Sequence, residues 1–310
     1  MKLVKLKDIN LIYSNISEDT YSEYNKSTTY NTGDRVYVTK ESDGTTERTP
    51  HEIYESLADN NTGNYPPDNP DKWGRISATN RWKMFDEYIN TQTENSENIE
   101  VVVEFSLCDT FALFGLDANT VDWYLYDGDY TDSGNLITSG SIDLSEPVGN
   151  WYEYFYGDIE YRTEIYINNI PNYLNGQLRV VINNSAANTK CGMLCIGREV
   201  FLGLTQYDVS TSITDYSRKN IDEWGNIYLK KGNYAKKVEC DFWLETGQVD
   251  FVRKKLADVR ATPTIFNVNN DALQDNSFSS LIVYGFYKDF NIIIPGHSYS
   301  KCSLEIEGII

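Results

Sequence analysis

Short runs in which apolar and polar residues alternate occur along much of the chain. In residues 120–126, Val121, Trp123 and Leu125 occupy alternate positions, so they share one face of an extended strand. Similar runs rich in apolar and β-branched residues recur through the middle of the chain, at 98–106, 111–116, 136–142, 161–167, 177–183 and 193–197. Strands at this spacing, separated by turn residues, predict a β-sandwich or jelly roll over residues 79–205.

The pattern changes in the last third of the chain. Apolar residues at Val249, Val252, Leu256 and Val259 are separated by three, four and three positions, which predicts a helix over 248–259. Strand-like runs lie on both sides of it, at 227–230, 236–243, 261–267, 280–285 and 302–308. Residues 206–310 therefore form a predicted α+β domain.

Aromatic residues and turns dominate the N-terminal part. Residues 1–20 predict a leader strand, and residues 21–78 follow with Tyr30, a turn at 33–34, a strand at 35–39, then Tyr54, a Pro-rich loop and Trp73. This order resembles the chitin-binding type modules of carbohydrate-binding family 5/12, which are small three-stranded sheets. The polar stretch 40–51 is longer than the corresponding loop of that family.

The resemblance implies that Tyr30, Tyr54 and Trp73 bind glycan by stacking on the C–H faces of sugars. A second interpretation assigns the same three rings to the core of the module, because a domain this small has little else to bury.

The order of all these parts resembles minor tail or baseplate proteins of tailed bacteriophages, and the sandwich resembles galactose-binding-like domains in outline. The segments that carry the tail-protein resemblance lie at 202–207, 215–219, 224–226, 285–290 and 302–308. It implies a non-catalytic virion component, assembled in the host cytoplasm in multiple copies of a symmetric assembly. The expected partners are other tail or baseplate proteins and a host-surface glycan. Two alternatives stay open: a stand-alone carbohydrate-binding protein or accessory module of a polysaccharide-degrading system, and a tail-associated glycan hydrolase.

Charge narrows the range of partners. The chain has 27 Lys and Arg against 46 Asp and Glu, a net charge of −19. Binding to nucleic acid or to an anionic membrane requires clustered basic residues, so neither partner is expected. No apolar stretch is long enough for membrane insertion, and the first ten residues do not form a secretory signal. Five scattered cysteines predict reduced thiols rather than a disulfide framework.

Candidate chemistry is sparse, and we expect neither an enzyme nor a cofactor. The two histidines, His51 and His297, lie in polar segments without a recognisable catalytic motif. Cys191 and Cys195 lack the second pair that a structural zinc site needs, so buried strand residues are the favoured interpretation.

Two sets of acidic residues are further candidates for a functional site. Asp127, Asp129 and Asp132 share one Gly-containing loop, which suggests a calcium site, although a solvated turn is the simpler interpretation. Glu153 and Asp158, in the aromatic run 151–158, are the first candidates for the carboxylate pair of a hydrolase; the same run also fits an aromatic patch.

Overall fold

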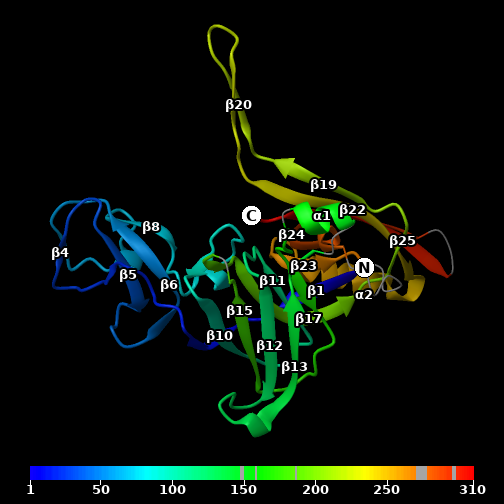
Figure 1. Ribbon diagram of the computed structural model, residues 1–310, viewed down its shortest axis with the longest axis horizontal. Coiled ribbons are helices and arrows are strands. Elements are labelled where there is room, and N and C mark those ends of the chain that lie inside the picture. Colours follow the sequence, from blue (N-terminus) through cyan, green and yellow to red (C-terminus); the bar gives the residue numbers. More distant parts are fainter. Residues whose placement is uncertain (147–149, 158, 186, 270–277, 295–297) are drawn as a thin grey trace.

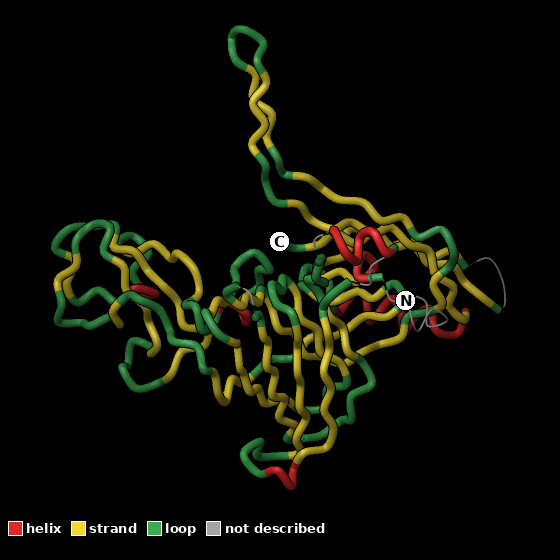
Figure 2. The backbone as a smooth tube through the Cα atoms, in the orientation of Figure 1, coloured by secondary structure: helices red, strands yellow, loops and turns green. Residues whose placement is uncertain are grey.

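The computed structural model describes residues 1–146, 150–157, 159–185, 187–269, 278–294 and 298–310. The protein is mainly β, as the sequence predicted (Figure 1). A small lobe holds residues 21–78, two large sheets form the body, and a narrow hairpin projects from it (Figure 2). The helical elements are short: η1 (Pro66–Asp68), η2 (Lys83–Phe85), η3 (Ser133–Asn135), α1 (Trp151–Tyr156), η4 (Thr246–Gln248), α2 (Val249–Asp258) and η6 (Ser279–Leu281).

One ten-stranded sheet runs through the body. Nine of its strands follow in the order β14 (Ile165–Ile167), β11 (Thr110–Phe114), β17 (Met193–Phe201), β1 (Lys2–Leu6), β23 (Thr264–Asn267), β24 (Ile282–Ile293), β25 (Tyr299–Gly308), β22 (Tyr234–Glu245) and β18 (Leu204–Thr205). The tenth, β19 (Ser210–Asp215), also pairs with β22. The sequence predicted a division after residue 205, but hydrogen-bonded strands from both sides of that position share this sheet.

The strand predicted as a leader lies in the middle of the same sheet. Lys2 of β1 lies opposite Phe201 of β17 on one side and Asn267 of β23 on the other. Its side chains alternate between two cores, because Leu3 packs with the C-terminal residues whereas Val4 packs with β11, β17 and β23. β1 therefore joins the two halves of the body.

A five-stranded sheet packs against part of the large one. Its order is β13 (Leu136–Asp143), β12 (Thr120–Asp127), β15 (Gly176–Asn183), β10 (Asn98–Phe105) and β2 (Asn10–Ser14). Val101, Leu125 and Val180 face a shared core with Phe111 and Leu194 of β11 and β17. Beside it, β9 (Thr93–Asn95) pairs with β16 (Thr189–Cys191). The alternation in residues 120–126 correctly placed Val121, Trp123 and Leu125 on one face, because Val121 and Leu125 lie in this core and Trp123 packs against it.

The predicted helix is confirmed as α2. Val252 and Leu256 are fully buried against Phe242 and Phe266 of the large sheet. Burial of one apolar stripe on a sheet is what holds a helix of this length in place, since short helices are marginal alone.

The small lobe holds a four-stranded sheet, where the sequence led us to expect three strands. Its order is β3 (Ser22–Glu23), β5 (Arg35–Lys40), β6 (Glu47–Ser56) and β8 (Trp73–Ala78). The additional strand, β3, pairs in parallel with β5. A separate pair, β4 (Thr29–Tyr30) and β7 (Asn61–Thr62), closes the lobe.

Candidate functional site

The three rings predicted to bind sugar form the core of the lobe. Trp73 is 2% exposed, and Tyr30 and Tyr54 are buried with it. The rings of Tyr30 and Trp73 meet edge to face with centroids 5.2 Å apart, and the indole N–H of Trp73 donates to the Asn64 carbonyl at 3.0 Å. Buried rings present no open face to a ligand. The structure therefore places the three rings in the core of the module, as the second interpretation did.

Two other tyrosines lie beside a hollow on this lobe. Tyr24 and Tyr65 are half-buried, and with the loop 39–44 they line a cavity of about 720 Å³. The Tyr65 hydroxyl donates to the Lys40 carbonyl at 2.5 Å. The buried Tyr24 hydroxyl has no hydrogen-bond partner among the described residues, and burial raises its pKa. Neither ring was predicted from the sequence, because the aromatic positions of the family give no sign of which rings are buried.

In the acidic loop, residues 127–134, the carboxylates accept hydrogen bonds from backbone N–H groups of the same loop. One Asp129 carboxylate oxygen accepts from the backbone N–H and the hydroxyl of Thr131, at 2.9 and 2.8 Å. Asp132 accepts from Gly134 N–H at 2.8 Å, and Asp127 ends strand β12. These contacts are those of ordinary turns. Within the described ranges, we find no group of three metal-ligating side chains, here or elsewhere.

His51 lies at the joint between lobe and body. It is buried, its Nδ1 lies 3.0 Å from Glu18 Oε1, and its ring packs 5.0 Å from that of Trp82. Burial raises the pKa of Glu18, but hydrogen bonds from His51 and Thr79 outweigh it and leave that pKa below its usual value. This arrangement joins the small lobe to the body.

Among the remaining candidates, the structure describes the cysteines in full. All five cysteines are free and buried, and burial raises the pKa of Cys108 to about 11 and that of Cys191 to about 12. A thiol of this kind is inert, because the thiolate is the reactive form. His297, Asp158 and the Glu153 side chain lie outside the described residues.

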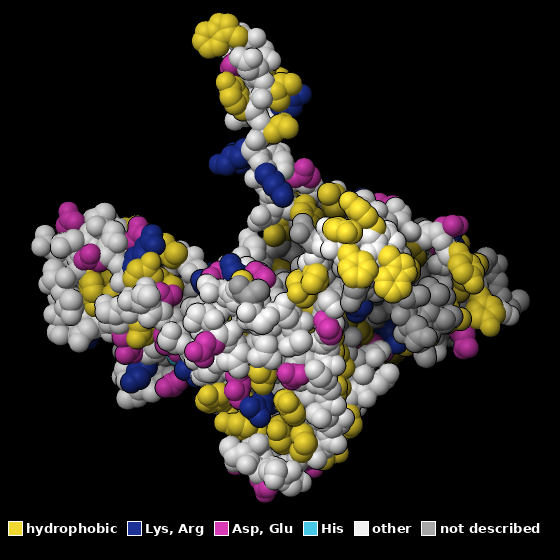
Figure 3. Space-filling view, viewed as in Figure 1, with side chains coloured by type: hydrophobic (Ala, Val, Ile, Leu, Met, Phe, Trp, Pro, Cys, Tyr) yellow, Lys and Arg dark blue, Asp and Glu magenta, His cyan; other side chains and the backbone are white. Residues whose placement is uncertain are grey.

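The most exposed feature of the body is a projecting hairpin, which we call the arm (residues 216–233). It consists of β20 (Arg218–Ile221) and β21 (Ile227–Lys230), and it extends away from the sheet on the continuation of β19 and β22 (Figure 1). Trp224 at its tip is 84% exposed and Leu229 is 78% exposed. Figure 3 shows hydrophobic side chains along the arm and basic side chains nearer its root.

The turn at the tip of the arm is well specified. Asp222 accepts from the backbone N–H groups of Trp224 and Asn226, at 3.0 and 2.7 Å, and from the Asn226 side chain. Gly225 takes a φ of +84°, which favours glycine. At the root, a side chain at Gly232 would meet the Tyr216 carbonyl at 2.6 Å, so glycine allows the two strands to approach.

The arm has two different faces. Ile221 pairs with Ile227 and Lys219 with Leu229, whereas the other face carries the pairs Arg218–Lys230 and Asn220–Tyr228. In the described part of the chain, the hydrogen bonds of residues 218–231 all lie within the arm. An isolated two-stranded hairpin is marginally stable in water, so contact of this arm with another surface would stabilise it.

No known protein family, curated protein or solved structure matches the chain. The functional proposal therefore depends on the arrangement of the chain's own residues. Among the helices that the structure describes, none is both long and apolar enough to cross a bilayer.

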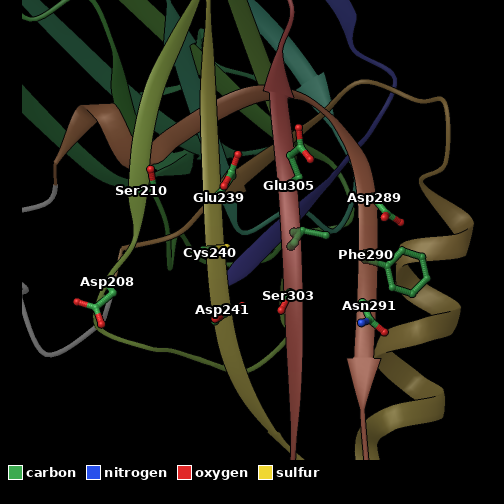
Figure 4. A pocket seen from close by; sticks show the side chains of 11 residues that line it. Asp208, Ser210, Glu239, Cys240, Asp241, Asp289, Phe290, Asn291, Ser303 and Glu305 are labelled. Atoms are coloured by element: carbon green, nitrogen blue, oxygen red, sulfur yellow. The ribbon is translucent and has the colours of Figure 1, made fainter.

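A trough on the outer face of the C-terminal half carries a row of carboxylates. Glu239 of β22 lies opposite Glu305 of β25, which lies opposite Asp289 of β24 (Figure 4). The cavity over this row has a volume of about 370 Å³, and Asp208 and Asn291 also line it.

Lysines neutralise part of this row. Lys237 contacts Glu239 at 2.7 Å and Glu305 at 3.0 Å, and its hydrogen bond to Glu305 holds the pKa of that carboxyl below its usual value. Asp208 and Asp289 have no ion-pair partner in the part of the chain that is described. The trough therefore contains two carboxylates that no described side chain neutralises.

A second exposed apolar surface lies on α1. Trp151, Tyr152, Phe155 and Tyr156 are all exposed, and hydrophobic side chains gather there in Figure 3. These residues belong to the aromatic run 151–158, for which an aromatic patch was one of the two interpretations of the sequence. Exposed aromatic groups of this size are typical of protein interfaces.

Proposed function

We propose that the protein is a non-catalytic structural component of a bacteriophage virion, in the tail or baseplate, that docks with neighbouring subunits through the arm. The arm carries the proposal: a hairpin with Trp224 at its tip and one apolar face, with no layer of the described chain packed over it. Trp and Tyr dominate the binding energy of protein interfaces, because they bury large areas at low entropic cost. The order of parts in the sequence supports the choice of virion.

The fold assignments at the finer level belong to this proposal. We assign the two packed sheets around Val101 and Phe111 to a galactose-binding-like sandwich, and the lobe of residues 21–78 to a carbohydrate-binding-like module. In this proposal the lobe is a spacer whose aromatic core keeps it folded, and its surface is available to a neighbour or a glycan.

The test is the composition of purified particles and the fate of an armless variant. Mass spectrometry of gradient-purified virions should detect the chain. A variant in which residues 218–231 are replaced by a short Gly-Ser turn should fold with the wild-type circular dichroism spectrum but be absent from particles. A charge-reversed control on the solvent face of α2, Lys254→Glu, should be incorporated normally. Abundance in host lysate with absence from particles contradicts the proposal.

A second function, glycan contact by the lobe, is favoured by the hollow beside Tyr24 and Tyr65. The rings of Tyr24 and Tyr65 that line this hollow suit the C–H face of a sugar. Glycan-array binding of the wild type, lost in Tyr65→Ala with an unchanged melting temperature, would support this function. A wild type that binds no glycan on the array would leave the lobe as a spacer.

A further inference from the structure

Like charges face each other on the arm. Arg218 lies directly opposite Lys230 in the ladder, and neither has an acidic side chain within ion-pair distance in the described ranges. Like charges at directly opposed positions destabilise a strand pair. The arm as a whole carries four basic and two acidic residues, in a chain of net charge −19. The face of the arm that carries Arg218 and Lys230 would therefore be stabilised by contact with an acidic surface.

The trough shows the opposite arrangement. Glu239, Glu305 and Asp289 stand in one row across three strands, and the lysines that contact this row leave Asp289 without a partner in the described chain. This sheet face is open and hollowed, with Glu239, Glu305 and Asp289 seen together in Figure 4. A basic strand face laid over the row would relieve the repulsion between Arg218 and Lys230, and it would supply Asp289 with a cation that the described chain does not give it.

The arm of one chain does not lie over its own trough. In Figure 1 the arm runs away from the sheet formed by β22, β25 and β24, which carries the row. The two surfaces are complementary in charge but separated within one chain, so a second copy is the occupant that supplies what each lacks.

We infer that the arm of one copy docks on the acidic trough of a second copy, with Arg218 and Lys230 over the row of Glu239, Glu305 and Asp289. This inference rests on the proposed role of the arm as a docking element and names a partner for its basic face, which lies opposite the apolar face. The contact joins two different surfaces, so it is heterologous. Repetition of such a contact builds a ring if the rotation closes, or a filament if it does not.

Charge reversal tests the pairing. The arm-reversed variant, Arg218→Glu with Lys230→Glu, and the row-reversed variant, Glu239→Lys with Asp289→Lys, alter exposed residues and should keep the wild-type melting curve. In sedimentation velocity over a wide concentration range, the wild type should self-associate. Each variant alone should associate at least about tenfold more weakly. Arg253→Glu with Lys254→Glu on α2 makes the same change in charge as the arm reversal and should associate like the wild type.

Mixing the two reversed variants decides the matter. The acidic arm of one then fits the basic row of the other, and the unchanged arm and row also match, so association should return to near the wild-type level. A wild type that stays monomeric at every concentration overturns the inference. So does a row-reversed variant that associates normally, or a mixture that stays dissociated.

A cross-link provides an independent measurement. All five native cysteines are buried, so a chain carrying Asn220→Cys on the basic face and Asn291→Cys in the trough has two reactive thiols. Oxidation should give a ladder of covalent oligomers, and single variants should give at most dimers. A ladder that fails to form overturns the docking geometry. If the chain is found in virions but neither test shows self-docking, the proposed function stands and this inference falls.

Discussion

Removal of one ring should unfold the small lobe while the body stays folded. In Trp73→Ala the lost side chain is 2% exposed and contacts the rings of Tyr30 and Tyr24, with centroids at 5.2 and 6.0 Å. Truncation of such an aromatic costs about 3–5 kcal/mol. A core the size of this lobe supplies no more than about 3–5 kcal/mol of net stability. The two magnitudes are comparable, so the variant lobe should be largely unfolded at room temperature.

The assay is hydrogen exchange followed by mass spectrometry on the full chain. Amides of β5 and β6 should lose their protection in Trp73→Ala, whereas those of β10 and β15 should exchange as in the wild type. Trp224→Ala is the matched control, because the same chemical change at a side chain that is 84% exposed should alter stability by less than about 0.5 kcal/mol. Protection of β5 and β6 that survives in Trp73→Ala would refute the reasoning, because the ring would then not hold the core.

Three further predictions address the cysteines, the joint and the arm. The five thiols should resist alkylation in the native protein and all react after unfolding without reductant, as intact mass would show; two disulfides would contradict this. The lowered pKa of Glu18 contributes stability above about pH 4.5 that is lost as pH falls through its folded pKa, so the melting temperature of the wild type should fall more than that of Glu18→Gln between about pH 5 and pH 3. Equal slopes would remove Glu18 from the acid response. Asp222→Ala should speed exchange of the Trp224 and Asn226 amides with less than about 0.5 kcal/mol of global destabilisation, and unchanged exchange would show that the turn does not depend on that carboxylate.

Local patterns in the sequence predicted many of the elements. The alternation around Val121 and Leu125 gave the buried face of β12, and the spacing of Val252 and Leu256 gave α2, because each pattern reports a single face of a single element. Pairing between distant strands has no such local signal. The position of β1 between β17 and β23 depends on partners that lie far along the chain, Phe201 and Asn267 being opposite Lys2, and so it was not predictable from its own sequence.

The exposure of individual side chains was also not predictable from the sequence. Trp73 and Trp224 are the same residue type in similar Gly- and Asn-containing surroundings, yet one is a core ring and the other a free tip. A hairpin signal was present, since the turn 222–226 separates two matching runs, and it would have predicted the arm. Whether a layer covers a hairpin depends on the rest of the fold.

The central position of β1 has a consequence for biosynthesis. Both partners of this strand follow it in the chain, since β17 ends at Phe201 and β23 begins at Thr264, so they are translated much later. During elongation β1 waits unpaired, and neither core that it joins is complete until its last partner has been synthesised. A nascent chain stalled before residue 264 therefore carries one open edge of β1, where Leu3 and Val4 lack their neighbours Phe266 and Ile265, and this edge is a target for chaperones or for aggregation.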